Sequence, residues 1–429
     1  MKLSLRALLP RAPLARGVTV LVTGSALGQV LVLAASPLLT RLYTPADFGI
    51  LGVFSALSTI LGVVVSLRYE LAIPLAEDDG RVVNLLALSL VAALIVSSLT
   101  GAILWLWGDV ITGWLNAEAL RPLLWLLPVG LLAVGCMRAL IHWAIRRQDF
   151  GHITRTEISR SIGRVVTQIG FGFVVSGPFG LLIGQIIGQS AGITTLARAF
   201  HRREGLLWRT IRLGDMARAA SRFAKLAMLA TGAALLNNGG QLAPALFIAA
   251  LYGVEVAGWY ALAQRILETP ALVSTAVARV YLSEAPRRAR ANVASMYALF
   301  KAATWRLLAF GLLTLGLVVV AGPQLFGLVF GSAWAEAGQF AQFLALMALG
   351  RLVVHPVAQT LIVLERQDLQ LAWDVLRFGA LLLVFLAARQ LTWSPLLTIG
   401  VLSVTMTLCY VLLFVLTRQV LLSRLHARV

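Results

Sequence analysis

Long runs of apolar residues, separated by short polar segments, recur along the whole chain. An α-helix needs about 20 predominantly apolar residues to cross a bilayer, and twelve runs approach or exceed that length. They cover residues 18–40, 47–67, 82–107, 122–145, 156–176, 179–197, 223–250, 257–279, 305–330, 337–363, 370–388 and 395–417. The pattern predicts an all-α integral membrane protein with about 12 transmembrane helices.

The composition agrees with a membrane protein. Of the 429 residues, 59% are hydrophobic and 13% are charged, and the mean hydropathy is +0.87. Soluble domains are about 45–50% apolar and about 25% charged, so a water-soluble enzyme is excluded. Disorder is excluded because it requires low hydrophobicity. Both cysteines, Cys136 and Cys409, lie inside apolar runs, and we therefore expect no disulfide framework, no metal site and no cofactor.

The basic residues are unevenly distributed between alternate loops. The chain has 36 basic and 18 acidic residues. If the N-terminus is cytoplasmic, 27 basic residues fall on the cytoplasmic side and only Arg41, Arg121 and Arg389 on the other. This asymmetry follows the positive-inside rule and predicts that both termini are cytoplasmic. Topology and anionic membrane lipids thus explain the net charge of +18, and we expect no nucleic acid partner.

The longest cytoplasmic loop divides the predicted helices into six and six. We therefore predict an N-terminal lobe over residues 1–200, a basic cytoplasmic linker over 201–222 and a C-terminal lobe over 223–429. Residues 237–241, which read NNGGQ, interrupt the seventh span, and they predict either a broken helix that lines a cavity or a simple kink.

Short sequence matches relate the two halves. One match has a gapless offset and follows the first and seventh spans; another follows the fourth and tenth. The matches are Leu42-Tyr43 and Gly49 with Leu251-Tyr252 and Gly258, and Arg147-Gln148-Asp149 with Arg366-Gln367-Asp368. They predict a duplicated six-helix unit. Such duplication places a substrate path near the middle of the membrane, between two lobes.

Six arginines lie inside the predicted spans rather than at their ends. They are Arg138, Arg160, Arg164, Arg265, Arg351 and Arg377. An arginine at the bilayer centre costs about 2.5–3.5 kcal/mol on the insertion scale, so six facing lipid would cost roughly 15–20 kcal/mol. We therefore expect them to face protein or a water-filled cavity.

Two acids in the spans balance part of this charge. Glu268 lies three residues after Arg265, and Asp374 lies three residues before Arg377, so that each pair can share one helix face. These pairs either serve transport or simply join helices. We expect an excess of about four arginines, which favours an anionic, phosphate-bearing substrate.

Two of these six arginines have an alternative explanation. Arg160 and Arg164 lie early in the fifth span and can extend to the cytoplasmic surface. Arg68, at the inner end of the second span, can do the same with Glu70 as a local partner.

Three segments resemble one family of transporters. Residues 39–49 (LTRLYTPADFG) and 68–73 (RYELAI) resemble Wzx-type oligosaccharide-lipid flippases of the multidrug/oligosaccharidyl-lipid/polysaccharide exporter superfamily. Residues 258–265 (GWYALAQR), followed by Pro270, resemble the eighth span of that family. Helix number and the division into six and six extend the resemblance over essentially the whole chain.

The resemblance implies a transporter that makes and breaks no bond. Such a protein moves an undecaprenyl-pyrophosphate-linked oligosaccharide across the bacterial inner membrane by alternating access, for polysaccharide biosynthesis such as that of O-antigen in lipopolysaccharide, and in several members an H⁺ or Na⁺ gradient drives it. Glu268 and Asp374 are our candidates for ion coupling. The candidate substrate-binding residues of a cationic cavity are Arg138, Arg265, Arg351, Arg377, Arg164 and Arg68.

Three other classes of protein fit less well. A drug exporter of the same superfamily would favour an acidic interior for cationic drugs. A major-facilitator transporter usually carries a Gly-x-x-x-Asp-Arg-type sequence between its second and third spans, and residues 68–81 lack it. A polysaccharide polymerase or ligase needs sizeable outer loops, whereas the longest predicted outer loop here is about residues 108–120.

Overall fold

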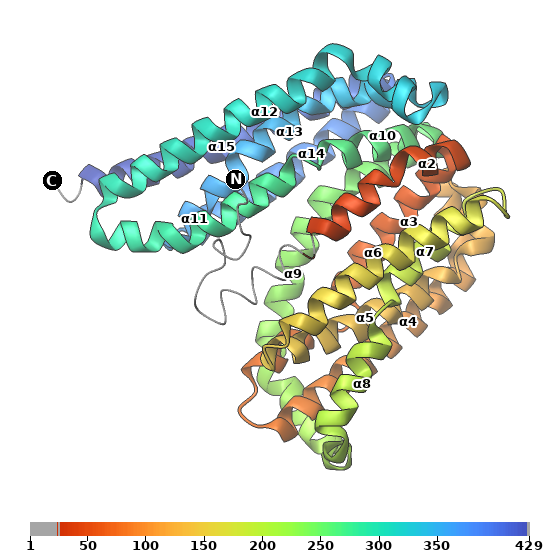
Figure 1. The fold of residues 1–429 in the computed structure, drawn as a ribbon, viewed down its shortest axis with the longest axis vertical. Helices are drawn as coiled ribbons and strands as arrows, with labels where there is room; N and C mark the ends of the chain where they lie inside the picture. The colour runs from red at the N-terminus through yellow and green to blue at the C-terminus, as the bar shows by residue number, and fades with distance from the viewer. Residues whose placement is uncertain (1–23, 25, 427–429) are drawn as a thin grey trace, which may run out of the picture. The chain divides into compact units, whose positions relative to one another are not determined.

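The computed structural model describes residue 24 and residues 26–426, and these are almost entirely α-helical (Figure 1). The elements before the centre of the chain are α2 (Ser36–Leu42), α3 (Pro45–Val64), η2 (Tyr69–Leu75), α4 (Asp79–Trp114), η3 (Glu118–Leu123), α5 (Leu126–Arg146), α6 (Phe150–Gly172), α7 (Phe179–Ser190), α8 (Ile193–Glu204) and η4 (Gly205–Thr210). They are followed by α9 (Leu213–Tyr252), α10 (Val254–Leu267), α11 (Ala271–Ala291), α12 (Val293–Phe330), η5 (Ser332–Trp334), α13 (Ala335–Val363), α14 (Gln367–Gln390) and α15 (Pro395–His426). The prediction of an all-α membrane protein is confirmed.

Nine helical segments within the described residues are long and apolar enough to cross a membrane, and they coincide with nine of the twelve predicted spans. The other three differ for local reasons. The first is the shorter apolar helix Ala26–Leu42, and residues 18–23 and 25 of that prediction lie outside the described residues. The fifth is α6, whose charged side chains lower its hydropathy. The eighth is divided between α10 and α11 by a turn that ends at Pro270.

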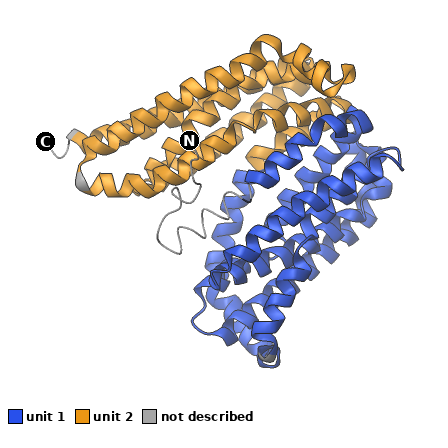
Figure 2. Cartoon of the chain, in the orientation of Figure 1, with its two compact units in different colours: residues 1–238 blue, residues 239–429 orange. Residues whose placement is uncertain are grey.

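The chain forms two compact units, residues 1–238 and 239–429 (Figure 2). The boundary lies inside α9, in the NNGGQ segment, and the helix continues through it without a break. Most of the predicted linker, residues 201–222, is folded onto the first unit: the backbone N–H of Arg212 donates to Asn84 Oδ1 on α4 (3.1 Å), and Asn84 Nδ2 donates to the carbonyl oxygen of Thr210 (3.3 Å).

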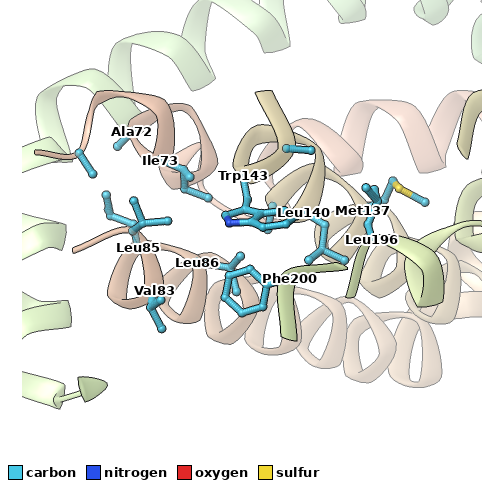
Figure 3. Close-up of a cluster of buried hydrophobic side chains, with 14 of the residues drawn as sticks. Ala72, Ile73, Val83, Leu85, Leu86, Met137, Leu140, Trp143, Leu196 and Phe200 are labelled. Carbon is cyan, nitrogen blue, oxygen red and sulfur yellow. The ribbon is translucent and has the colours of Figure 1, made fainter. Parts of the chain in front are cut away.

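A hydrophobic core joins η2, α4, α5 and α8 within the first unit (Figure 3). Its centre is Trp143 of α5, which is fully buried and packs edge-to-face on Phe200 of α8, with the ring centroids 5.2 Å apart. Ile73 of η2 and Leu86 of α4 belong to the same cluster. This core holds in place the turn between α3 and α4, which carries several polar residues discussed below.

Glycines on α7 permit close contact with α6. A Cβ atom at Gly184 would lie 2.3 Å from Cγ of Gln168 and 2.9 Å from the carbonyl oxygen of Arg164, which no real Cβ atom tolerates. A Cβ atom at Gly188 would lie 3.0 Å from Cβ of Arg164. The small residues therefore bring α7 onto the face of α6 that carries Arg164.

The two units share structural features that support the internal repeat. The hydroxyl of Tyr43 donates to the carbonyl oxygen of Gln168 at the end of α6 (2.7 Å). The hydroxyl of Tyr252, the residue matched to Tyr43, donates to the carbonyl oxygen of Trp393 just after α14 (3.0 Å). In each unit the tyrosine thus joins the end of the first membrane segment to the end of the fifth.

The backbone after α5 and α13 shows that the match between the two Arg-Gln-Asp tripeptides does not align structurally equivalent residues. Helices α5 and α13 end in the same turn, with a left-handed residue at Gln148 (φ 54°) and at Glu365 (φ 59°). The backbone hydrogen bonds around these residues are also the same, since Asp149 N–H bonds to Ala144 and Arg366 N–H bonds to Leu361. The two Arg-Gln-Asp tripeptides are therefore displaced by two residues from structural equivalence.

Candidate functional site

In the first unit, the turn after α3 brings a buried carboxylate near two arginines. Glu70 is 0% exposed, and its Oε2 atom accepts a hydrogen bond from the hydroxyl of Ser66 (2.7 Å). The other oxygen, Oε1, has no hydrogen-bond partner in the described structure. Arg138 of α5 donates from Nη1 to the carbonyl oxygen of Gly62 (2.5 Å) and lies within electrostatic range of both Glu70 and Arg68.

Arg68 occupies an unusual backbone conformation. Leu67 (φ 49°) and Arg68 (φ 61°) are consecutive non-glycine residues in the left-handed region, a conformation that costs of order 1–3 kcal/mol per residue. The prediction that Arg68 extends to the surface is only partly met, because the side chain is half-buried and its Nε atom is fully enclosed. Within the described residues, that N–H has no acceptor.

The arginines of α6 have different environments. Arg160 donates from Nη1 to Glu157 Oε1 (2.8 Å) and from Nε to the carbonyl oxygen of Gly188 (2.7 Å). Glu157 is an acid near the start of the fifth span that the sequence count omitted, and it neutralises Arg160. Arg164 packs against Gly188, and its buried Nε atom lacks an acceptor in the part of the chain described.

In the second unit, Glu268 has a partner on another helix. Its carboxylate lies 3.4 Å from Nη1 of Arg351 on α13, and 44% and 35% of the two side chains are exposed. Glu268 thus contacts an arginine on another helix, and its expected pairing with Arg265 stays a prediction. Arg265 lies two residues before the end of α10 and is half-buried.

The second predicted pair is present. Nη2 of Arg377 lies 3.3 Å from Oδ1 of Asp374, one turn away on α14. The Arg377 side chain is only 7% exposed; its guanidinium lies 4.8 Å from the ring centre of Trp373 and against Gly240 of α9, where a Cβ atom would be 3.0 Å from Nη2. Nε and Nη2 of Arg377 make no hydrogen bond within the described structure.

Each unit therefore contains enclosed guanidinium N–H groups without an acceptor: Arg68 and Arg164 in the first, and Arg377 in the second. A buried donor that lacks an acceptor costs about 1–3 kcal/mol, more when it is charged, and an anion with several oxygen acceptors would remove that cost. The sequence identified Arg164 and Arg377 because charges in apolar runs stand out, and Arg68 because it follows the end of the second span. It did not identify Ser66 or Trp373, since nothing local marks them.

Comparison with known proteins was informative at the level of family and fold. The profile of a family described as "Polysaccharide biosynthesis protein" matches residues 38–339. A search of curated proteins found no match.

Several solved transporters are similar in fold. The lipid II flippase MurJ in its inward closed conformation has a TM-score of 0.68 and 10% identity, over 95% of this chain and 90% of that chain. An inward-facing multidrug resistance MATE transporter of the MOP superfamily has a TM-score of 0.65 and 12% identity, over 94% of each chain. A MOP superfamily transporter from Pyrococcus furiosus, described as having a binding pocket of reverse polarity, has a TM-score of 0.58 and 14% identity over 99% of each chain. These likenesses agree with 12 transmembrane helices in two lobes.

Proposed function

This chain belongs to the family of polysaccharide biosynthesis proteins, and we propose that it translocates a polyprenyl-pyrophosphate-linked oligosaccharide across the bacterial inner membrane. The membrane-transporter fold is shared with a lipid II flippase, which supports a lipid-linked substrate. In this proposal both termini are cytoplasmic, the glycan is destined for a surface polysaccharide such as O-antigen, and no bond is made or broken.

The observation that carries the proposal is the set of enclosed arginine donors in both units. Pyrophosphate offers several anionic oxygens, and guanidinium binds such groups through paired, charge-assisted hydrogen bonds. Arg68, Arg138 and Arg164 supply donors in the first unit, and Arg351 and Arg377 in the second. An exporter of cationic drugs would instead require an excess of acids.

The proposed cycle assigns separate roles to the headgroup and the lipid tail. The arginines hold the pyrophosphate while the polyprenyl chain remains in the surrounding lipid. A conformational change of the two units then exposes the headgroup first to the cytoplasmic side and later to the periplasmic side. This transport cycle requires that the arginines release their partners within the protein when the phosphate binds.

The two carboxylates of the second unit fit a role in ion coupling. Glu268 and Asp374 contact Arg351 and Arg377 at 3.4 Å and 3.3 Å. If phosphate draws the arginine away, the carboxylate loses its cation and gains affinity for H⁺ or Na⁺, because an opposite charge nearby favours the ionised form and its loss favours neutralisation. Substrate binding and ion binding would then be linked.

Arginine substitutions test the proposal. Arg138→Ala and Arg377→Ala variants, together with Arg138→Lys and Arg377→Lys, are expressed in a strain whose own flippase is deleted, and accumulation of lipid-linked glycan in the inner leaflet is measured. We expect the alanine variants to accumulate the lipid and the lysine variants to be intermediate, because lysine keeps the charge but not the paired donors. Arg389→Ala, at an exposed position on the same helix as Arg377, is the matched control. Normal export by both alanine variants at normal protein level would contradict the proposal.

A further inference from the structure

A pocket of about 510 Å³ lies within the first unit, between the start of α4 and the first turns of α9. Its size falls in the range of roughly 300–1,000 Å³ that small-molecule sites occupy. The walls are held by Asn84, which is 5% exposed and joins the start of α4 to the segment at residues 210–212. Besides the hydrogen bonds at Thr210 and Arg212, its Nδ2 atom donates to the carbonyl oxygen of Gly80 (2.9 Å). The pocket is therefore a built feature of the unit, formed by segments about 130 residues apart in the chain.

The charged side chains that line the pocket are balanced. Three are acidic and three are basic: Glu77, Asp78, Asp215, Arg81, Arg218 and Arg222. Glu77 lies 2.5 Å from Arg81 and 2.7 Å from Arg222, and Arg218 lies 2.5 Å from Asp215. A free phosphate would have to displace a carboxylate from its arginine. The balance instead favours a neutral ligand.

These pairs leave hydrogen-bonding capacity for such a ligand. Between 36% and 83% of each of the six side chains is exposed. A guanidinium has five N–H donors and a carboxylate about four acceptor positions, so that each ion pair still offers both kinds of group. The hydrogen bonds from Arg222 and Arg81 lower the pKa of Glu77, which therefore remains an ionised acceptor at neutral pH.

An aromatic side chain completes the lining. Phe223 is half-buried on α9 and lines the pocket, with the guanidinium of Arg222 5.5 Å from its ring centre. A sugar ring has hydroxyl groups that each donate and accept a hydrogen bond, and it also has an apolar C–H face. Paired charged side chains beside an aromatic ring match both properties.

We propose that this pocket binds one or more sugar residues of the transported glycan and so contributes to substrate selection. The inference rests on the proposed function, because it takes the ligand to be the glycan part of the lipid-linked substrate. The pocket lies among loops that the charge distribution assigns to the cytoplasmic side, where the glycan is located before translocation. Recognition of the sugar there would precede, and be separate from, binding of the pyrophosphate by the arginines within the membrane.

The test compares two lipids that differ only in their sugars. The full-length protein in nanodiscs is titrated with undecaprenyl pyrophosphate, or with undecaprenyl pyrophosphate that carries a neutral trisaccharide, and the Kd of each is measured. We expect the trisaccharide lipid to bind at least about fivefold more tightly, the factor that one net hydrogen bond of about 1 kcal/mol supplies. Arg222→Gln and Phe223→Leu are expected to abolish this difference while leaving the Kd of the sugar-free lipid unchanged.

A matched control lies on α8. Arg202→Gln removes an exposed arginine outside the pocket and is expected to retain the sugar-dependent gain. Equal binding of both lipids to the wild-type protein, or a full gain in both pocket variants, would overturn this inference alone. Failure of both lipids to bind would overturn the proposed function, and the inference with it.

Discussion

Substitutions at Arg377 can distinguish a role in stability from a role in transport. Its side chain is 7% exposed and its partner Asp374 is 19% exposed, so the pair is largely enclosed. Arg377→Gln leaves the carboxylate without its cation, and breaking a buried pair from one side costs about 3–5 kcal/mol. Loss of the contact with Trp373 adds about 0.5–2 kcal/mol. We therefore expect clear destabilisation, measured by unfolding in a denaturing-detergent titration followed by tryptophan fluorescence.

A double variant shows whether the unpaired charge causes the loss of stability. In Asp374→Asn with Arg377→Gln the unpaired charge is gone, and a double-mutant cycle should show a coupling free energy of about 0.5–3 kcal/mol, so that the double variant is more stable than the sum of the single effects predicts. Additive effects would refute the ion pair. We further expect this stabilised double variant to remain defective in glycan export. Wild-type export by the double variant would refute the assignment of Arg377 to phosphate binding.

Two other predictions concern packing and pH. Gly184→Ala places a methyl group against α6 where there is no room, so we expect a loss of about 1–3 kcal/mol in the same unfolding assay, whereas Gly170→Ala, in open space, should cause none. The pKa of Glu77 is lowered chiefly by its hydrogen bond to Arg222, so its stabilising contribution is present above the usual glutamate pKa and is lost as the pH falls through the lowered value. Melting temperatures of the wild type and Glu77→Gln should therefore differ at neutral pH and converge as the pH falls through the lowered pKa. A difference in melting temperature that stays unchanged at low pH would contradict a stabilising contact between Glu77 and Arg222.

Local pattern was a good guide to the helices but a poorer one to their limits. Long apolar runs identified α3, α4 and α12 because hydropathy over about 20 residues is a property of the segment alone. The eighth span was wrongly read as one helix, since the pattern did not weigh Pro270, which directly precedes α11. The predicted lobe boundary in the longest basic loop stays a prediction, and the chain divides into two compact units inside α9.

In the candidate site, too, the sequence predicted features of single segments but not contacts between helices. Any arginine inside an apolar run carries a large cost in lipid, and this reasoning found all six without knowledge of neighbours. Spacing along one helix correctly paired Asp374 with Arg377. Spacing could not reveal the contact of Glu268 with Arg351, because it joins positions 83 residues apart.

The amino-acid sequence by itself determined that this protein is a bundle of membrane helices with a basic interior, because hydrophobicity and charge act on each segment independently of the rest. Only the tertiary structure decided which acid neutralises which arginine, which guanidinium N–H groups are left without an acceptor, and that the starts of α4 and α9 enclose a polar pocket. These features depend on distances of a few ångströms between side chains from different helices. Such distances are set by how the helices pack, and no local pattern encodes them.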